Sequence, residues 1–181
     1  MNEPESILNI LETQNLKIGY AGRGRKTVVA DGLNLQLQKG ELIGLLGPNG
    51  SGKSTLIRTL AHMQKPLAGN VKLEGTDLSR LNINEVAKKV STVLTDRVRI
   101  GNLTVYNLIA FGRSPYTGMM GRLRDEDREV VDWAIKAAGL TDFVNRDIQK
   151  LSDGERQKVM IARALAQDTP VILLDEPTAH S

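Results

Sequence analysis

The chain has 181 residues, of which 40% are hydrophobic and 25% are charged. These are the proportions of an ordinary globular domain, and they exclude a disordered or fibrous chain. The 24 basic and 21 acidic residues give a net charge of +3, which is too balanced to indicate a nucleic-acid partner. The chain has no cysteine, no apolar run near the roughly 20 residues that span a bilayer and no signal-peptide pattern at its start. We therefore expect a cytoplasmic protein that binds no nucleic acid.

The first part of the chain has the period of β-strands. Residues 8–20 and 33–37 alternate apolar and polar positions, which predicts short antiparallel strands. The turn-forming residues between these runs are Gly22, Gly24, Asp31 and Gly32.

A strand, a glycine-rich loop and a helix follow. Residues 41–46 form a compact apolar run that predicts a strand, 47–52 are rich in glycine, and 53–62 predict a helix. Pro66 and Gly69 end this unit. Such an order places the loop at the amino terminus of the helix, where backbone amides favour an anion.

The loop itself has the sequence Gly47-Pro48-Asn49-Gly50-Ser51-Gly52-Lys53-Ser54, which satisfies the pattern of a phosphate-binding P-loop. Glycines let the amides turn toward phosphate oxygens, Lys53 reaches the β and γ phosphates, and the hydroxyl of Ser54 can bind Mg²⁺. The alternative, a glycine turn beside a stray lysine, does not explain the flanking strand and helix. Because kinases, GTPases and ATPases share this loop, it predicts the nucleotide and not the function. The candidate nucleotide-binding residues are Gly47, Asn49, Gly50, Ser51, Gly52, Lys53, Ser54 and its neighbour Thr55.

The middle of the chain predicts helices. An apolar patch at 90–94 precedes residues 96–150, which we expect to be mostly helical. Asp125 can cap a helix that ends at Gly139. The residues expected on one apolar face of that helix are Val130, Trp133, Ala134 and Ala137.

Two carboxylates follow the last predicted strand. Residues 155–166 predict a helix, and 171–174 predict an apolar strand that is buried on both faces of a parallel sheet. Asp175 and Glu176 then lie at the carboxyl end of that strand, where α/β sheets bind ligands. Asp175 is a candidate to hold Mg²⁺, and Glu176 is a candidate to polarise the water that attacks the γ phosphate. An acidic pair that merely ends a strand at the surface is the alternative.

A third motif, residues 151–157 with the sequence Leu-Ser-Asp-Gly-Glu-Arg-Gln, precedes the carboxylates. The order of P-loop, this motif and the acidic strand resembles the ATP-binding-cassette (ABC) transporter ATPases along essentially the whole chain. The resemblance implies an α/β fold: a P-loop NTPase, RecA-like core with an antiparallel β subdomain and a helical subdomain. It assigns residues 1–95 and 151–181 to the core and β subdomain, and 96–150 to the helical subdomain.

The resemblance also implies a second ATPase subunit in a head-to-tail dimer. In this family the signature serine and second glycine, here Ser152 and Gly154, close over the γ phosphate bound by the partner's P-loop. A serine that only caps the helix before Glu155 is also consistent with these residues. Tyr20 lies where the family places an aromatic that stacks on adenine, although an aromatic at a strand end is often simply packed.

Residues 110–116 (Ala-Phe-Gly-Arg-Ser-Pro-Tyr) resemble the importer branch that serves iron-siderophore, haem and cobalamin permeases. The expected protein is then a Mg²⁺- and ATP-dependent subunit that binds a transmembrane permease at the cytoplasmic face of the inner membrane. Three arginines, Arg113, Arg122 and Arg124, either contact that permease or form a solvated basic face.

The sequence departs from the family in several places. Thr95, followed by Asp96, stands where a glutamine is usual, and Asp153 replaces the first signature glycine. The sequence ends at Ser181, before the family's switch histidine and the strand that carries it, so we expect the carboxyl-terminal part of the core to be missing and the isolated chain to be unstable and inactive. A truncated or degenerate nucleotide-binding module without turnover is therefore the alternative. A soluble family member in DNA repair or translation would need a long coiled-coil insertion or a second cassette.

Overall fold

The computed structural model describes residues 9–22, 24–94, 102–118 and 121–175. Two compact units are distinguished, Met1–Val86 and Ala87–Ser181, and each is described by itself. This division differs from the family-based assignment of residues 96–150 to a helical subdomain, which stays a prediction. Within the described ranges, none of the helices has the length and hydropathy that a membrane span requires.

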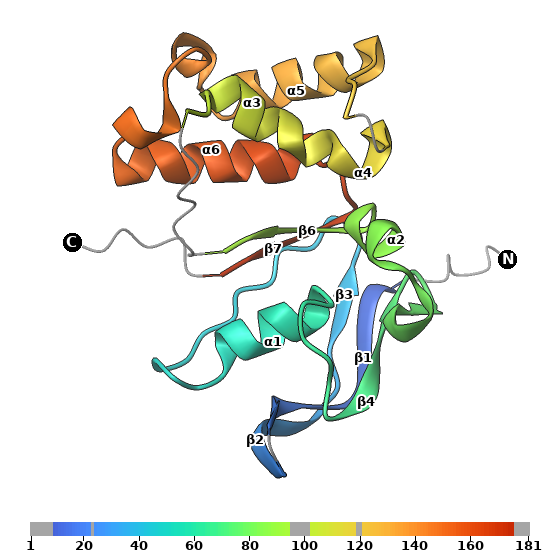
Figure 1. Cartoon of the computed structure of the whole chain (residues 1–181). Helices are drawn as coiled ribbons and strands as arrows, with labels where there is room; N and C mark the ends of the chain where they lie inside the picture. Colours follow the sequence, from blue (N-terminus) through green and yellow to red (C-terminus); the bar gives the residue numbers. More distant parts are fainter. Residues whose placement is uncertain (1–8, 23, 95–101, 119–120, 176–181) are drawn as a thin grey trace, which may run out of the picture. The chain divides into compact units, whose positions relative to one another are not determined.

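The first unit is built on a long, bent strand, β1 (Asn9–Gly22), which pairs antiparallel with three other strands (Figure 1). Its early residues pair with β3 (Gln36–Gln38) and β4 (Ala68–Leu73) and its later ones with β2 (Arg25–Leu33), with register shifts between the pairings. The expected antiparallel layer is confirmed, but the strand expected at 33–37 is wrong: Asp31 and Gly32, expected in a turn, lie inside β2, and β3 begins only at Gln36. The other elements of this unit are β2 (Arg25–Leu33), β3 (Gln36–Gln38), α1 (Lys53–Leu60), β4 (Ala68–Leu73), β5 (Thr76–Asp77), a 3-10 turn η1 (Leu78–Arg80) and α2 (Ile83–Ala87), whose last residue begins the second unit.

Helix α1 packs on this sheet through its apolar face. Leu56, Ile57 and Leu60 are buried, as are Leu16 and Ile18 of β1. Spacing of i, i+1 and i+4 puts these helix residues on one side, so the same burial that stabilises the helix also fixes it beside the strand. Because the P-loop leads directly into α1, the packing of this helix also fixes the position of the loop's last residues.

The strand expected at 41–46 is wrong in this structure. Residues 41–48 have no strand assignment and join neither of the sheets formed by the described residues. Leu42 and Leu46 are 95% and 94% exposed. An apolar sequence favours a strand only when a neighbour accepts its backbone hydrogen bonds, and none of the described strands pairs with this segment.

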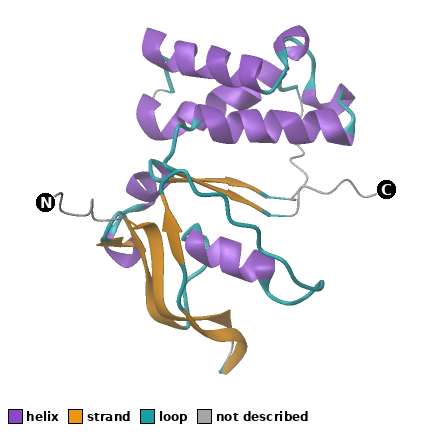
Figure 2. Cartoon of the chain, turned by 180° about the vertical axis from the view of Figure 1, so that it is seen from behind, coloured by secondary structure: helices purple, strands orange, loops and turns teal. Residues whose placement is uncertain are grey.

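In the second unit, three helices gather around one apolar core (Figure 2). These helices are α3 (Val105–Ala110), α5 (Asp125–Ala137) and α6 (Asp153–Ala166). The core includes Val105 and Ile109 of α3, Val131 of α5 and Val159 of α6, all fully buried. The elements are β6 (Val90–Val93), α3 (Val105–Ala110), η2 (Phe111–Arg113), α4 (Ser114–Thr117), α5 (Asp125–Ala137), η3 (Thr141–Phe143), η4 (Ile148–Lys150), α6 (Asp153–Ala166) and β7 (Val171–Leu174).

The expected buried face of α5 is only partly right. Ala134 is buried, but Trp133 is 56% exposed. The buried positions are Asp127, Val131, Ala134 and Ile135, which follow the spacing i, i+4, i+7 and i+8 of a helix face. The first buried position of this face is the charged Asp127, so a pattern of apolar residues alone does not predict where the face begins. Its N-cap is Arg124, and Asp125 is already the first helical residue.

The last strand, β7, pairs in parallel with β6 in a two-stranded sheet. The expected strand and its parallel pairing are confirmed. The expected burial of both strand faces is wrong, because Ile172 and Leu174 are 41% and 45% exposed, whereas Val171 is buried. Alternate exposure of this kind is what a strand shows when only one of its faces is covered.

Candidate functional site

The loop at 47–54 has the backbone that phosphate binding needs. Gly50 and Gly52 adopt φ values of 79° and 99°, in the left-handed region that favours glycine. Gly52 is the N-cap of α1, and a Cβ built there would lie within 3.0 Å of the side chain of Val29 in β2. Glycine is therefore required at 52 both by the backbone and by the packing. The contact of Val29 with the loop has no signal in the sequence.

Lys53 lies against the loop that precedes it. Its Nζ donates hydrogen bonds to the carbonyl oxygens of Gly47, at 2.9 Å, and Pro48, at 3.1 Å. The amide of Ser51 donates to the same Pro48 carbonyl at 3.2 Å, which closes the turn. A cation at the base of a glycine loop, next to a helix amino terminus, is a donor set suited to phosphate oxygens. The exposed Ser54 in the first turn of α1 fits the role of a Mg²⁺ ligand that accompanies phosphates.

Tyr20 lies beside the helix that follows this loop. Its hydroxyl is 2.8 Å from Oγ1 of Thr55, a buried residue of the first turn of α1, whereas the tyrosine as a whole is 51% exposed. The structure thus brings together two residues that are 35 positions apart in the chain. The exposed remainder of the ring is compatible with the predicted stacking on a base, which itself stays a prediction.

The signature residues begin helix α6. Ser152 is its N-cap: the hydroxyl accepts a hydrogen bond from the amide of Glu155 at 3.3 Å and donates to the Glu155 carboxylate at 2.7 Å. That carboxylate also accepts from the amide of Ser152, and these bonds lower the pKa of Glu155. Ser152 and Gly154 are exposed, so both are accessible to a ligand at the amino terminus of the helix.

Asp175 follows β7 directly. Its amide donates to the carbonyl of Val93 at 2.9 Å, which continues the β6–β7 ladder, and its side chain is buried. The expected position at the carboxyl end of a strand is confirmed. Glu176, Thr95 and Asp96 lie outside the described residues.

The candidate residues divide between the two units. The loop and Tyr20 belong to the first, whereas Ser152, Gly154 and Asp175 belong to the second. The shared Mg²⁺ site of Ser54 and Asp175 therefore stays a prediction from the sequence. Among the residues the structure describes, no three His, Cys, Asp or Glu side chains form a metal-binding group.

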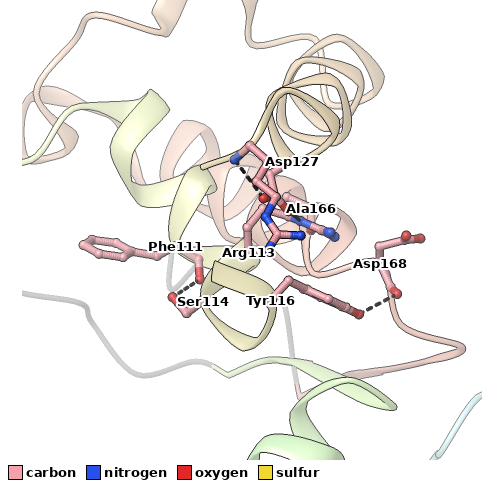
Figure 3. A network of polar contacts seen from close by, with 8 residues as sticks. Phe111, Arg113, Ser114, Tyr116, Asp127, Ala166 and Asp168 are labelled. Carbon is pink, nitrogen blue, oxygen red and sulfur yellow. Dashed lines mark hydrogen bonds and ion pairs between the residues drawn. The ribbon is translucent and has the colours of Figure 1, made fainter. Parts of the chain in front are cut away.

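Arg113, expected at a permease contact or on a basic face, is instead buried inside the helical group (Figure 3). Its Nε donates to Asp127 at 2.9 Å, Nη1 donates to the carbonyl of Ala166 at 3.1 Å, and its guanidinium lies 4.0 Å from the ring centroid of Tyr116. The hydroxyl of Tyr116 donates to the carbonyl of Asp168 at 3.3 Å. Arg113 therefore ties η2 and α5 to the end of α6, and both surface roles expected for it are wrong. Arg122 and Arg124 are exposed.

Comparison with known proteins gives concordant results. The profile of a family described as ABC transporter matches residues 30–179. An uncharacterised ABC transporter ATP-binding protein of Methanocaldococcus jannaschii is 43% identical over 94% of this chain and 57% of its own length. The iron(3+)-hydroxamate import ATP-binding protein FhuC of Bacillus subtilis is 39% identical over 96% of this chain and 63% of its own length. Further relatives are named as siderophore transport and cobalamin import ATP-binding proteins.

Among solved structures, the dimeric structure of a bacterial ABC transporter cassette superposes with a TM-score of 0.78 at 30% identity, covering 93% of this chain and 74% of that one. The expected P-loop α/β fold with its antiparallel sheet and helical part is thereby confirmed. The chain spans about three fifths of the length of the first two curated relatives, 57% and 63%.

Proposed function

This chain belongs to the ABC transporter ATPase family, and from that premise we propose that it is the ATP-binding subunit of an importer that couples Mg²⁺-dependent ATP hydrolysis to substrate uptake. The single observation that carries the proposal is the loop at 47–54, where two left-handed glycines and Lys53 precede a packed helix. That arrangement is suited to the β and γ phosphates of a nucleotide. The substrate class we infer is an iron-siderophore, haem or cobalamin, supported by what the relatives are named for.

Each candidate residue has a defined task in this proposal. The loop amides and Lys53 bind the phosphates, and Tyr20 stacks on adenine. Ser54 and Asp175 hold Mg²⁺, which when bound neutralises the phosphate charge. Glu176 accepts the proton of the attacking water. Hydroxyl, carboxylate and phosphate oxygens are the ligands that Mg²⁺ prefers, so the residue types agree with the metal.

We infer two protein partners. A second ATPase subunit would meet the exposed start of α6, where Ser152 and Gly154 complete its nucleotide site; a dimer in a similar cassette structure supports this arrangement. A transmembrane permease is the second partner, because the relatives are named as import proteins. The subunit would then be peripheral at the cytoplasmic face of the inner membrane.

The proposal is tested by Lys53→Ala, with ATP binding measured by equilibrium titration. Removing the ammonium that neutralises the phosphates should abolish detectable binding. Lys65→Ala removes the same charge from an exposed position just beyond α1 and should bind ATP like the unaltered chain. Equal affinity of the Lys53 variant and the unaltered chain would contradict the P-loop assignment.

A nucleotide-binding module without turnover is the second candidate, favoured by Thr95 at the usual glutamine position and by the apolar segment 42–46, which pairs with none of the described strands. Both candidates predict ATP binding, and they differ in hydrolysis. Phosphate release by the transporter assembled with this subunit, with Lys53→Ala as the blank, separates them.

A further inference from the structure

The hydrogen bond between Tyr20 and Thr55 links two parts of the nucleotide site that the sequence treats separately. Tyr20 lies near the end of β1, and Thr55 is the third residue of α1. Their hydroxyl oxygens are 2.8 Å apart. The tip of the aromatic ring is therefore attached to the first turn of the helix that presents Lys53.

The backbone under Tyr20 is fixed as well. Tyr20 pairs with Thr27 of β2, and at the neighbouring Gly19 an added Cβ would lie within 3.0 Å of the Thr27 carbonyl. The Gly19 carbonyl also accepts a hydrogen bond from the side-chain amide of Gln64, just beyond the end of α1. Strand and helix are thus joined at both ends of α1, by Gln64 and by Thr55.

Thr55 offers a hydroxyl in a defined place. It is 5% exposed, and its carbonyl accepts from the hydroxyl of Thr59 at 2.7 Å in the next turn. Tyr20 is 51% exposed, so its hydroxyl end is anchored while much of its ring surface stays open. A tyrosine fixed at its backbone and at its tip has few rotamers left, and a ligand that stacks on it need not restrict it further.

We propose that Tyr20 is a positioning residue that acts through its hydroxyl. The hydrogen bond to Thr55 fixes the position of the ring relative to the phosphate-binding turn. Binding of the base on the ring and binding of the phosphates in the loop therefore strengthen each other. The inference rests on the proposed function, because it requires a nucleotide whose phosphates occupy the loop. It goes further by giving the hydroxyl, and not only the ring, a part in affinity. A ring alone would need only an aromatic residue at position 20.

The test is equilibrium binding of two ligands, Mg²⁺-ATP and Mg²⁺-tripolyphosphate, to the whole chain and its variants. Tyr20→Phe keeps the ring and removes the hydroxyl. We expect it to weaken ATP binding about three- to tenfold, the scale of one net hydrogen bond, and to leave tripolyphosphate binding unchanged. Thr55→Val removes the other hydroxyl; in that background, Tyr20→Phe should cause no further loss of ATP affinity. Tyr106→Phe, in α3 of the other unit, is the matched control and should bind both ligands normally.

Three results would overturn the inference while ATP still binds the unaltered chain. These are ATP affinity of Tyr20→Phe within twofold of the unaltered chain, equal losses for ATP and tripolyphosphate, and additive losses in the double variant. If the unaltered chain binds neither ligand, the proposed function fails and the inference fails with it. A merely structural role of the hydroxyl would lower the unfolding midpoint and weaken both ligands alike, so the difference between the ligands is the decisive measurement.

Discussion

The guanidinium Nε of Arg113 lies 2.9 Å from Oδ1 of Asp127, and this ion pair is almost completely removed from solvent, with side chains 9% and 6% exposed. The second carboxylate oxygen accepts from the amide of Arg124 at 3.0 Å, so one aspartate both begins α5 and holds the arginine. Nη1 of Arg113 donates a hydrogen bond to the carbonyl of Ala166, the last residue of α6. The opposite end of α6 begins at its N-cap, Ser152.

Breaking this pair should destabilise the helical unit strongly. Asp127→Ala leaves a buried guanidinium without its carboxylate, for which we expect a loss of about 3–5 kcal/mol in the free energy of unfolding. Chemical denaturation measures it, and Asp132→Ala, exposed on the same helix, should change stability by less than about 0.5 kcal/mol. Similar losses for the two variants would show that the ion pair is not the cause.

The same carboxylate predicts a pH dependence. Burial by itself would raise the pKa of Asp127, but hydrogen bonds from the Arg124 amide and the Arg113 guanidinium outweigh it and lower the pKa. Because the folded pKa lies below the unfolded pKa of about 3.9, the stabilisation is present above that pH and is lost as the pH falls through the folded pKa. Denaturation across about pH 2 to 7 should show a shallower decline for Asp127→Asn than for the unaltered chain. Asp31, Asp77 and Glu155, whose pKa values are also lowered, titrate in both proteins and cancel in the difference.

Gly112 should tolerate no side chain. A Cβ there would lie within 3.0 Å of the Arg163 carbonyl oxygen and would touch the Gln167 amide, so η2 could not approach α6 as it does. We expect Gly112→Ala to cost about 1–3 kcal/mol of stability. Gly154→Ala is the control, since a Cβ there meets nothing within 4 Å. An unchanged melting temperature for Gly112→Ala would mean that the two segments separate easily.

Ser152 combines a structural and a functional task that substitution can separate. Ser152→Ala removes the N-cap of α6 and should cost about 0.5–2 kcal/mol of stability. Ser152→Asp restores a cap but places a negative charge where we propose the partner's γ phosphate binds. Stability should therefore recover in the aspartate variant while ATP turnover of the assembled transporter does not. Normal turnover with aspartate would argue against a contact of residue 152 with phosphate.

Glu176→Gln addresses the chemical step. We expect ATP binding to persist and hydrolysis by the assembled transporter to slow about a hundredfold or more, the scale of a positioned general base. Glu129→Gln, at an exposed position of α5, makes the same chemical change away from the site and should leave turnover normal. Near-normal turnover of Glu176→Gln would place the base at another residue.

The sequence by itself determined the turns and helix starts that depend only on residues a few positions apart in the chain. The glycine spacing before Lys53 specifies the left-handed turns and the start of α1, because few other residues adopt that backbone. Ser152 with Glu155 three positions later specifies the start of α6 through a capping box. Alternation in residues 8–20 and the apolar run at 171–174 likewise predicted strands that are present.

Tertiary structure decided the features that depend on partners far apart in the chain. Residues 41–46 have the composition of a strand, yet they form none, because strand formation requires backbone partners that the segment itself does not supply. Arg113 is charged and still buried, because Asp127 and the end of α6 satisfy its guanidinium. The bond between Tyr20 and Thr55 exists only because packing places α1 beside β1, so pairing between distant residues, and not local preference, determined how the two hydroxyls meet.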